Sequence, residues 1–342
     1  MTPSDPTVQQ IRERYARFAR DEAPGRSALY ADWAAGVASD PGAAGILARI
    51  PAAHRQPPLV FAVTRLLGAP ERPYAEWTAW VRDHADDVVA ECSRRSVQTN
   101  EPQRCAVLLP ALSLIDGPVA LLEVGASAGL CLYPDRYSCR YRTGDGLTTV
   151  DPSDGPSTVR LDCDVRGGTE VPMRMPRIVA RFGIDLQPLD ARDPADRRWL
   201  EGLVWPGEQG RVERVRAALD IAAADPPQLL AGDAADLLPE VAARVRRAAP
   251  DATLVVTTPG VLAHVPRAGR ERIIAAAERE GRWITLDAPA LHDAWHPAID
   301  EASWPGGFAL ALDGEVLAAV DPLGGWIRWR TERRGRDAPT PR

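Results

Sequence analysis

The pattern of apolar and polar positions changes near residue 118. Before that point apolar residues recur every three or four positions, which is typical of helices that bury one face. The expected helices cover residues 8–19, 27–39, 59–67, 74–93 and 102–114. Pro51, Pro57 and Pro70 separate them, because proline ends a helix that runs into it. The sequence therefore predicts an N-terminal helical domain over residues 1–117, a cap over the rest of the chain.

Beyond residue 118, short apolar runs alternate with helical segments, which is typical of strands in a mostly parallel sheet. The expected strands are 119–122, 178–186, 229–231, 252–258 and 283–286. The runs 308–312, 316–320 and 326–329 are expected to complete the sheet, and the first two flank Asp313-Gly314, a turn pair typical of an antiparallel hairpin. We predict an α/β domain over 118–333 with a doubly wound, mostly parallel, seven-stranded sheet.

Residues 138–177 fit neither pattern and are expected to be an insertion. A turn at 143–146 and alternating residues over 158–164 predict a β-hairpin, and Pro172 and Pro176 indicate irregular chain after it. We expect this hairpin to form a flap over the site. The polar residues 334–342 are expected to be a loose tail.

The stretch 123–129 follows the first expected strand and is the main candidate for a ligand site. Gly125 and Gly129 lack a Cβ atom, so a ligand can approach the backbone closely there. Ser127 could cap a helix expected to run to about Tyr137, whose free N–H groups would face the ligand. Glu123 could accept hydrogen bonds from a ligand amine or hydroxyl. The plainer interpretation is an ordinary glycine turn between a strand and a helix.

Glu123, Gly125 and Gly129 form a Glu-x-Gly-x-x-x-Gly motif that resembles the first motif of class I S-adenosylmethionine-dependent methyltransferases. The match to the dinucleotide-binding fingerprint is weaker, because its second and third glycines would fall on Ser127 and Leu130. An NAD-dependent enzyme is therefore a lesser alternative.

Acidic residues also follow the second and third expected strands. Asp185 stands where doubly wound folds place the acid that holds ribose hydroxyls. It lies 56 residues after Gly129, against about 20 in the usual fold, so the insertion must explain the spacing, and Asp135 and Asp145 are alternatives. Asp233 resembles the methyltransferase residue that binds the adenine amino group, but it could equally cap the helix that comes after it.

The resemblance implies a Rossmann-like methyltransferase fold with S-adenosylmethionine as cofactor. The residues expected to bind the cofactor are Glu123, Gly125, Ala126, Ser127, Gly129, Asp185, Asp233, Ala234 and Thr257. Polar residues expected to bind the substrate are Gln98, Asn100, Arg104, Tyr137 and Thr258, although Asn100 could instead cap the helix after it. The candidates for a catalytic base are Glu101, His264, His292 and His296.

The leading functional hypothesis is methyl transfer from S-adenosylmethionine to a small molecule in a closed pocket. A first alternative keeps the cofactor but changes the chemistry at the sulfonium, for example by cyclising the aminobutyrate arm. A second alternative is a binding or regulatory protein whose methyltransferase fold has lost catalysis. The fourth expected strand ends in hydroxyl side chains, which favours a protein without catalysis somewhat. The acids Glu123, Asp185 and Asp233 at strand ends argue against a full loss of function.

Over about residues 10–330 the chain also resembles a bacterial family of unknown function with a methyltransferase-like core. The residues that carry this resemblance are 98–101, 122–130, 135–137, 183–190 and 204–206. The chain departs from the family at Cys131, at Thr258-Pro259 and at 321–324, where relatives tend to carry Asn, His-Ser and His-Pro-His-Gly. These departures suggest a specialised substrate or a loss of the ancestral chemistry.

Composition narrows the partners. A net charge of −6 gives no reason to expect nucleic acid as a ligand. The 41 basic residues are all arginine, which excludes a Schiff-base lysine and a Walker lysine. The five cysteines form no C-x-x-C pair, so no metal site is expected. No apolar run is long enough for a membrane span, and the N-terminus lacks a signal pattern, so we expect a cytoplasmic protein, with monomer and homodimer both open.

Overall fold

The computed structural model describes residues 5–330, and the chain divides into two compact units. The first unit contains the residues up to Thr99 together with Asp190–Arg216. The second contains Asn100–Leu189 and the residues from Ala217 onward. The division thus differs from the boundary expected at residue 118, and the expected tail 334–342 lies outside the described residues.

The first unit is helical. Its helices are α1 (Pro6–Asp21), α2 (Ala28–Ser39), α3 (Pro41–Leu47), η1 (Ala52–His54), α4 (Pro57–Leu66), α5 (Tyr74–Asp83), α6 (Ala85–Arg94) and α8 (Pro194–Gly202). The side chains of Asp5, Ser27 and Asp40 accept hydrogen bonds from main-chain N–H groups at the starts of α1, α2 and α3. These caps explain why the apolar pattern becomes helix at those residues.

An aromatic cluster forms the core of the first unit. The ring of Phe61 lies 4.9 Å from Tyr30 and 5.5 Å from Trp33, and Trp33 stacks on Trp77 at 5.1 Å. Trp205 joins the cluster through Tyr30, at 5.7 Å. Residues 190–216 therefore belong to the helical unit because their aromatic side chain completes its core, which local sequence pattern does not reveal.

The second unit contains one mixed sheet of eleven strands rather than the seven expected. The strands are β1 (Pro118–Val124), β2 (Ser138–Thr143), β3 (Gly146–Val150), β4 (Arg160–Val165), β5 (Arg177–Asp185), β6 (Gln228–Ala231), β7 (Thr253–Pro259), β8 (Arg282–Asp287), β9 (Phe308–Leu312), β10 (Glu315–Val320) and β11 (Trp326–Trp329). Their order across the sheet is β3-β2-β4-β11-β10-β9-β8-β7-β1-β5-β6.

The helices of this unit are η2 (Pro102–Arg104), α7 (Cys105–Leu112), η3 (Leu130–Leu132), α10 (Ala234–Ala248), η4 (Leu262–His264), α11 (Arg267–Glu280) and η5 (Pro289–Leu291). The division between the units falls within α9 (Arg211–Ala224). No helix between residues 5 and 330 is long and apolar enough to cross a membrane.

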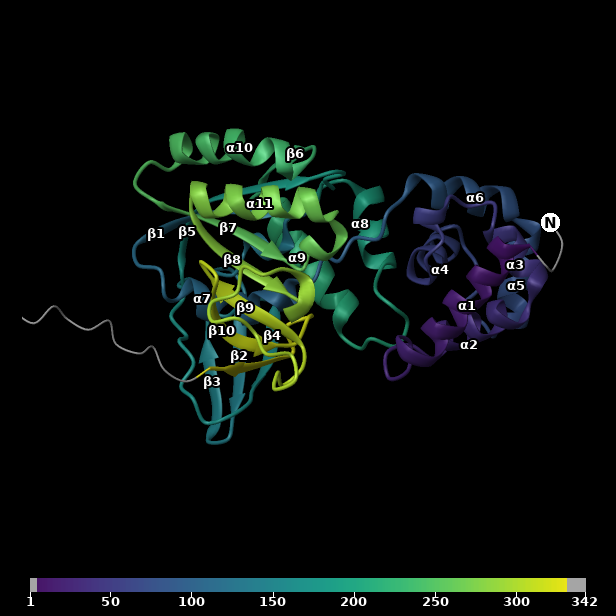
Figure 1. Cartoon of the computed structure of the whole chain (residues 1–342), viewed down its shortest axis with the longest axis horizontal. Coiled ribbons are helices and arrows are strands. Elements are labelled where there is room, and N and C mark those ends of the chain that lie inside the picture. Colours follow the sequence, from purple (N-terminus) through teal and green to yellow (C-terminus); the bar gives the residue numbers. More distant parts are fainter. Residues whose placement is uncertain (1–4, 331–342) are drawn as a thin grey trace, which may run out of the picture. The chain divides into compact units, whose positions relative to one another are not determined.

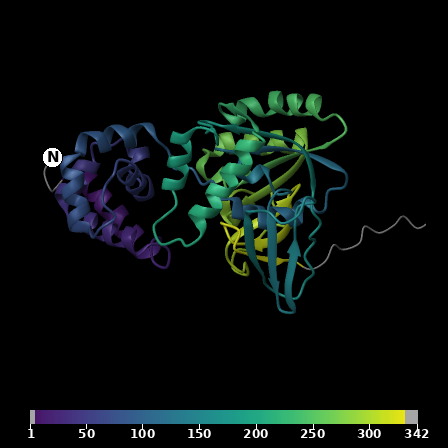
Figure 2. The same cartoon turned by 180° about the vertical axis from the view of Figure 1, so that it is seen from behind.

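The segment 138–177 contains the expected hairpin, with β2 and β3 joined by the turn at 143–146, but this hairpin is part of the sheet and not a flap. The segment adds β2, β3 and β4 to the sheet, and these are the teal strands seen from behind in Figure 2. The pairing partner is the last strand of the chain, since β4 runs parallel to β11, with Asp164 opposite Trp326. A strand edge paired in this way leaves its main-chain groups satisfied, which a free flap would not.

The centre of the sheet is parallel and places several polar residues together. β1 lies between β5 and β7, so Glu123 is opposite Gly183 on one side and Thr257 on the other. Because parallel strands end at the same edge, the carboxyl ends of β1, β5, β7 and β8 share one edge of the sheet.

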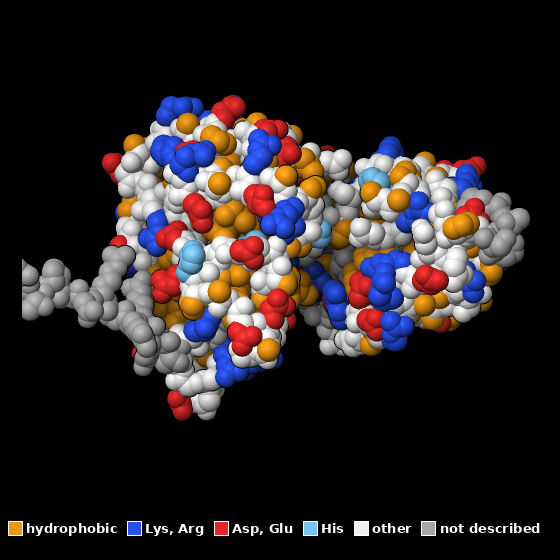
Figure 3. Space-filling view, in the orientation of Figure 1, with side chains coloured by type: hydrophobic (Ala, Val, Ile, Leu, Met, Phe, Trp, Pro, Cys, Tyr) orange, Lys and Arg blue, Asp and Glu red, His pale blue; other side chains and the backbone are white. Residues whose placement is uncertain are grey.

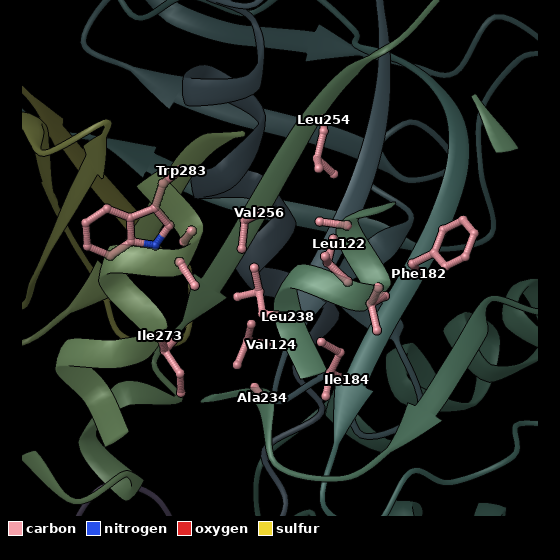
Figure 4. Packing of buried hydrophobic residues seen from close by; sticks show 14 of the residues in the cluster. Leu122, Val124, Phe182, Ile184, Ala234, Leu238, Leu254, Val256, Ile273 and Trp283 are labelled. Atoms are coloured by element: carbon pink, nitrogen blue, oxygen red, sulfur yellow. The ribbon is translucent and has the colours of Figure 1, made fainter. Parts of the chain in front are cut away.

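One face of this central sheet is covered by α10 and α11, which lie side by side in Figure 1. Figure 4 shows side chains of β1, β5, β7 and β8 packing against the apolar faces of these helices. The buried residues labelled there are Leu122, Val124, Phe182, Ile184, Ala234, Leu238, Leu254, Val256, Ile273 and Trp283. Since strand residues alternate between faces, Glu123 points to the opposite face from Leu122 and Val124.

The short helix α7 is buried along its whole length, which explains why its sequence is apolar on every side. It packs against β4 and β9, and the hydroxyl of Tyr141 on β2 donates to the Ala106 carbonyl at 2.7 Å. Outside the core, arginine and carboxylate side chains are interspersed over the surface shown in Figure 3.

Candidate functional site

The glycine turn, residues 125–129, lies directly against the end of β5. The N–H groups of Gly125 and Ala126 both donate to the carbonyl of Ile184, at 2.8 Å and 3.2 Å. This approach depends on Gly183, because a Cβ atom there would lie 2.5 Å from the Cβ of Ala126. Gly125 has φ +73°, a left-handed conformation that glycine adopts without steric cost.

The segment after the turn is not the expected helix. It forms only the three-residue η3 before turning towards β2. Pro134 would clash with the preceding turn of such a helix, and the hydroxyl of Tyr137 donates to the Leu130 carbonyl at 2.8 Å. The prediction of an α-helix N-terminus facing the ligand is therefore wrong, and the fully buried Tyr137 fastens this segment.

Two side chains hold the outer part of the turn. Asp185 accepts hydrogen bonds from the N–H groups of Ser127 and Gln187, each at 2.8 Å. The side chain of Asn100 donates to the Ser127 hydroxyl and accepts from the N–H of Ala128 at 3.2 Å. Ser127, with φ +52°, does not cap a helix as expected. Asn100 is thus placed at the turn, where it orders the main chain.

The structure separates the three acids considered for the ribose. Asp135 binds Arg181 through both oxygens at 2.9 Å, and Asp145 lies in the exposed turn between β2 and β3. Asp185 is the one in contact with the glycine turn. A carboxylate has about four acceptor positions, so two main-chain donors still leave room for ribose hydroxyls.

Glu123 is the most unusual polar residue at this edge. It is 3% exposed, and its Oε2 atom has no hydrogen-bond partner within residues 5–330. Burial raises the pKa of Glu123 well above its usual value; Cys131 and Asp185 add to this rise, while Arg104 opposes it. A buried carboxyl oxygen left without a donor is destabilising, and this atom retains the capacity to accept one more hydrogen bond.

Arg104 supplies positive charge close to Glu123. Its Nη1 donates to the Pro259 carbonyl at 2.7 Å and its Nε to the Pro322 carbonyl at 2.9 Å. Gly260, with φ +77°, allows this approach, since a Cβ atom there would lie 3.1 Å from Nη2. The guanidinium is thus held at the end of β7 by main-chain carbonyls, and its charge acts on the carboxyls of Glu123 and Asp287.

A second polar group occupies the opposite face of the sheet. Trp283 Nε1 donates to the Thr258 hydroxyl at 3.0 Å, which donates to the Thr285 hydroxyl at 2.8 Å, which in turn donates to Asp287 Oδ2. Because the indole can only donate, Thr258 is the acceptor in the first of these bonds. Thr258, expected to bind substrate, is instead fully buried with its hydroxyl engaged on both sides.

Asp287 is the last acceptor in this series of hydrogen bonds. Its carboxylate lies 3.7 Å from His292 Nε2, beyond hydrogen-bond distance. The carboxyl is 0% exposed, and burial raises its pKa although His292 and Thr285 act to lower it. His292 Nδ1 accepts from the Ala294 N–H at 3.3 Å, which leaves the proton of the neutral ring on Nε2, facing the carboxyl. Asp287 was not among the residues expected from the sequence.

Replacing Thr258 with valine is expected to lower the free energy of unfolding by about 1–3 kcal/mol, because it leaves the indole N–H of Trp283 and the hydroxyl of Thr285 without their partner. Chemical denaturation followed by tryptophan fluorescence measures this. Thr257→Val is the matched control, since the neighbouring hydroxyl takes no part in the chain. Equal stability of both variants would contradict the role given to Thr258.

The other expected base candidates are not brought together. His264 is exposed in η4, and His296 is exposed, with its main-chain N–H donating to the Gly314 carbonyl at 2.6 Å. Glu101 is buried and accepts from the Gln103 N–H at 3.0 Å, as the cap of η2. His292 is the candidate histidine placed beside an acid.

The remaining expected residues occupy varied positions. Gln98 belongs to the first unit, in the extended segment after α6. Thr257 lies buried at the end of β7, paired with Glu123. Gly129 has φ +74°, and Ala234 is buried in the first turn of α10.

Asp233 is the N-cap of α10, as the second interpretation of the sequence expects. Its Oδ1 accepts from the Ala235 N–H at 2.8 Å. Its second carboxylate oxygen is not used by the cap, and the carboxylate follows the end of β6 at the same edge as Asp185.

Leu186 is a residue that the sequence analysis did not select. It is 74% exposed although it directly follows Asp185 at the sheet edge. A large apolar side chain exposed beside a ribose-binding candidate offers a surface for a flat ring. The signal in the sequence is an apolar residue immediately after the acid that ends a strand.

Comparison with known proteins identifies a family. No curated protein and no solved structure matches the chain. A family model matches residues 12–329, which include most of the first unit and every strand of the second. The chain therefore belongs to the bacterial family described as "Uncharacterized protein conserved in bacteria (DUF2332)".

Proposed function

We propose that the protein binds S-adenosylmethionine at the carboxyl end of β1 and transfers its methyl group to a small molecule. The observation that carries this proposal is the buried carboxyl of Glu123, whose Oε2 has no donor within residues 5–330 and lies at the start of a glycine turn. A ligand ammonium group would supply that donor and compensate the charge.

The strand order supports a ligand at this place. Numbered along the chain, the five parallel strands β1, β5, β6, β7 and β8 are arranged 3-2-1-4-5, the order of a doubly wound sheet. The order reverses between β1 and β7, and ligands of such sheets bind outside the strand ends at that reversal. Antiparallel β9 then follows β8, so the proposed methyltransferase-like core is the part β6 to β10 of the longer sheet.

The turn itself favours S-adenosylmethionine over a dinucleotide. Dinucleotides place their pyrophosphate on the N-terminus of the helix after the glycine turn. Here the turn leads into three residues of 3-10 helix, which offers no aligned helix dipole. S-adenosylmethionine carries no phosphate and needs an acceptor for its amine, an acceptor for its ribose and a place for its adenine.

We assign those three roles to Glu123, to Asp185 and to Asp233 with Leu186. Methyl transfer is a displacement at the sulfonium, so the protein mainly has to align donor and acceptor. A base is needed only if the acceptor loses a proton, and His292 beside Asp287 is then the candidate with an acidic partner.

A binding protein without catalysis is the second candidate. It is favoured by Thr258 and Thr285, whose hydroxyls are engaged with each other and not available to a substrate. Titration calorimetry with S-adenosylmethionine, S-adenosylhomocysteine and NAD tests the shared cofactor site. Mass spectrometry of incubations with candidate acceptors then separates methylation, other sulfonium chemistry and binding alone. No heat with either sulfur compound would overturn the proposal.

Asp233→Asn tests the adenine role without disturbing the helix. Asparagine caps helices about as well as aspartate, so the melting temperature should stay constant. Affinity for S-adenosylmethionine should fall about 10-fold or more. The carboxylate oxygen that does not cap the helix is replaced by an amide N–H donor, which cannot accept from the adenine amino group. Asp193→Asn is the matched control, since Asp193 caps α8 through Oδ1 in the same way. Unchanged affinity of Asp233→Asn would contradict the assignment.

A further inference from the structure

A groove on the second unit lies apart from the glycine turn. It encloses about 430 Å³ between the loop 298–305 and the strands β10 and β11. Pockets of roughly 300–1,000 Å³ are typical of small-molecule sites. Four strand spacings separate β10 from β1, about 19 Å at the usual 4.8 Å, so the groove is a separate site.

The floor of the groove includes Ala319, a small residue of β10. Asp287, Ala309, Ala319 and Arg328 are direct partners on the neighbouring strands β8 to β11, so their side chains share one face of the sheet. Ala319 and Arg328 line the groove, whereas Ala309 and Asp287 are fully buried in the same row. The loop after β8 packs aromatic side chains against this row.

One wall of the groove is the indole of Trp304. The ring is partly buried and packs with Ile299 on the cluster formed by Trp295, Ala309 and Val316. Its Nε1 atom is buried and has no acceptor within residues 5–330. Indole N–H groups find a partner when buried, so this one indicates an acceptor atom supplied by a ligand.

The opposite side of the groove carries positive charge. Arg328 in β11 and Arg330 just after it both line the groove. Neither guanidinium forms an ion pair or a hydrogen bond in the described part of the chain. Arg330 lies 5.8 Å from the Trp304 ring centroid. Among the described residues of the lining the one acid is Asp300, whose carboxylate accepts from the Ala302 N–H at 3.1 Å.

We propose that this groove binds a small aromatic anion. Its carboxylate or phosphate group pairs with Arg328 and Arg330, its ring lies against Trp304, and an acceptor atom receives the indole N–H. A planar guanidinium binds either anion through two parallel hydrogen bonds. This site is independent of the proposed cofactor site and of methyl transfer.

Titration calorimetry of the full chain tests this with four probes. 2-Naphthoate and 2-naphthyl phosphate carry ring and charge, 2-naphthamide carries the ring alone, and acetate carries the charge alone. We expect saturable binding of one or both naphthyl anions. Naphthamide and acetate should bind with affinities at least about 10-fold lower. The preferred anion identifies the group that the natural ligand carries. Equal binding of naphthamide, or no binding of either naphthyl anion, would overturn the proposal.

Variants place the binding in the groove. Arg330→Gln should weaken the naphthyl anion at least 10-fold, and Trp304→Phe, which keeps a ring but removes the N–H, should weaken it severalfold. Arg247→Gln, at an exposed arginine in the last turn of α10, is the matched control and should leave affinity unchanged. Circular dichroism confirms that each variant is folded. Full affinity in folded Arg330→Gln would show that the anion binds elsewhere.

Discussion

Glu123→Gln should raise the melting temperature of the second unit at pH 8.5 by about 2–12 °C, and it should have little effect near pH 4. The variant replaces a buried carboxyl whose Oε2 has no donor within residues 5–330 by a neutral amide. The amide is still a buried polar group without a partner, but it cannot ionise, so the variant avoids the cost of a buried charge, about 1–3 kcal/mol. For a unit of this size, 1 kcal/mol corresponds to about 2–4 °C.

The pH dependence follows from the raised pKa of Glu123. Below the pKa of the unfolded chain, about 4.3, both states hold the proton, and the wild-type protein carries no ionic cost. As pH rises through the higher pKa of the folded state, the unfolded chain ionises freely and the native state loses stability. The advantage of glutamine therefore grows with pH, and scanning calorimetry at pH 4, 6 and 8.5 measures it.

Glu91→Gln is a control that should change the melting temperature in the opposite direction. Burial alone would raise the pKa of Glu91, but hydrogen bonds from Arg95 and Arg94 outweigh it and lower that pKa. Its loss should destabilise the first unit at neutral pH, with the difference disappearing in acid. A lower melting temperature of Glu123→Gln at pH 8.5 would show that the Glu123 carboxylate is stabilised by the fold.

The same Glu123→Gln variant should bind S-adenosylmethionine at least 10-fold more weakly, since an amide does not compensate the ligand ammonium charge. Greater stability with lost binding is the signature of a residue kept for a ligand. Greater stability with unchanged binding would leave the carboxyl unexplained and contradict the proposed function.

Gly125→Ala should lower the free energy of unfolding of the second unit by about 2–5 kcal/mol. A left-handed φ costs an L-residue about 1–2 kcal/mol, and Gly125 has φ +73°. In addition, the new Cβ would lie 2.4 Å from Cγ2 of Val261, and overpacking of this kind costs about 1–3 kcal/mol. Urea denaturation of the variant measures the sum.

Gly117→Ala separates the two contributions. Gly117 has φ +78°, but a Cβ atom added there would meet no atom within 4 Å, so the variant should show only the backbone cost. Val261→Ala in the Gly125→Ala background should recover part of the packing cost, because it removes the closest methyl group. Equal losses for the two glycines would mean that Val261 moves aside freely.

The sequence predicted the central strands well because they are encoded locally. The apolar runs before Glu123, Asp185 and Thr258 each became a strand, and the polar residues at their ends meet at one edge. The same local pattern could not distinguish a helix from a short turn after Gly129, where Pro134 and the bond from Tyr137 to Leu130 decide the conformation.

Long-range pairing explains the other differences. Nothing within residues 138–177 indicates that β4 pairs with residues more than 160 positions later, at Trp326 and Ile327. Likewise, Trp205 joins the helical unit through Tyr30, far away in the sequence. The sequence does not predict the series of hydrogen bonds ending at Asp287, because its hydroxyls and indole come from two strands and no single residue indicates the series by itself.

The position of β11 between β10 and β4 has a consequence for protein synthesis. During translation the strands β2, β3 and β4 leave the ribosome long before their neighbour, and the sheet is joined across β11 only when residues 326–329 emerge. Until then β4 presents an unpaired edge of the kind that recruits other chains. A nascent or truncated chain that stops before Trp326 is therefore the species most in need of a chaperone.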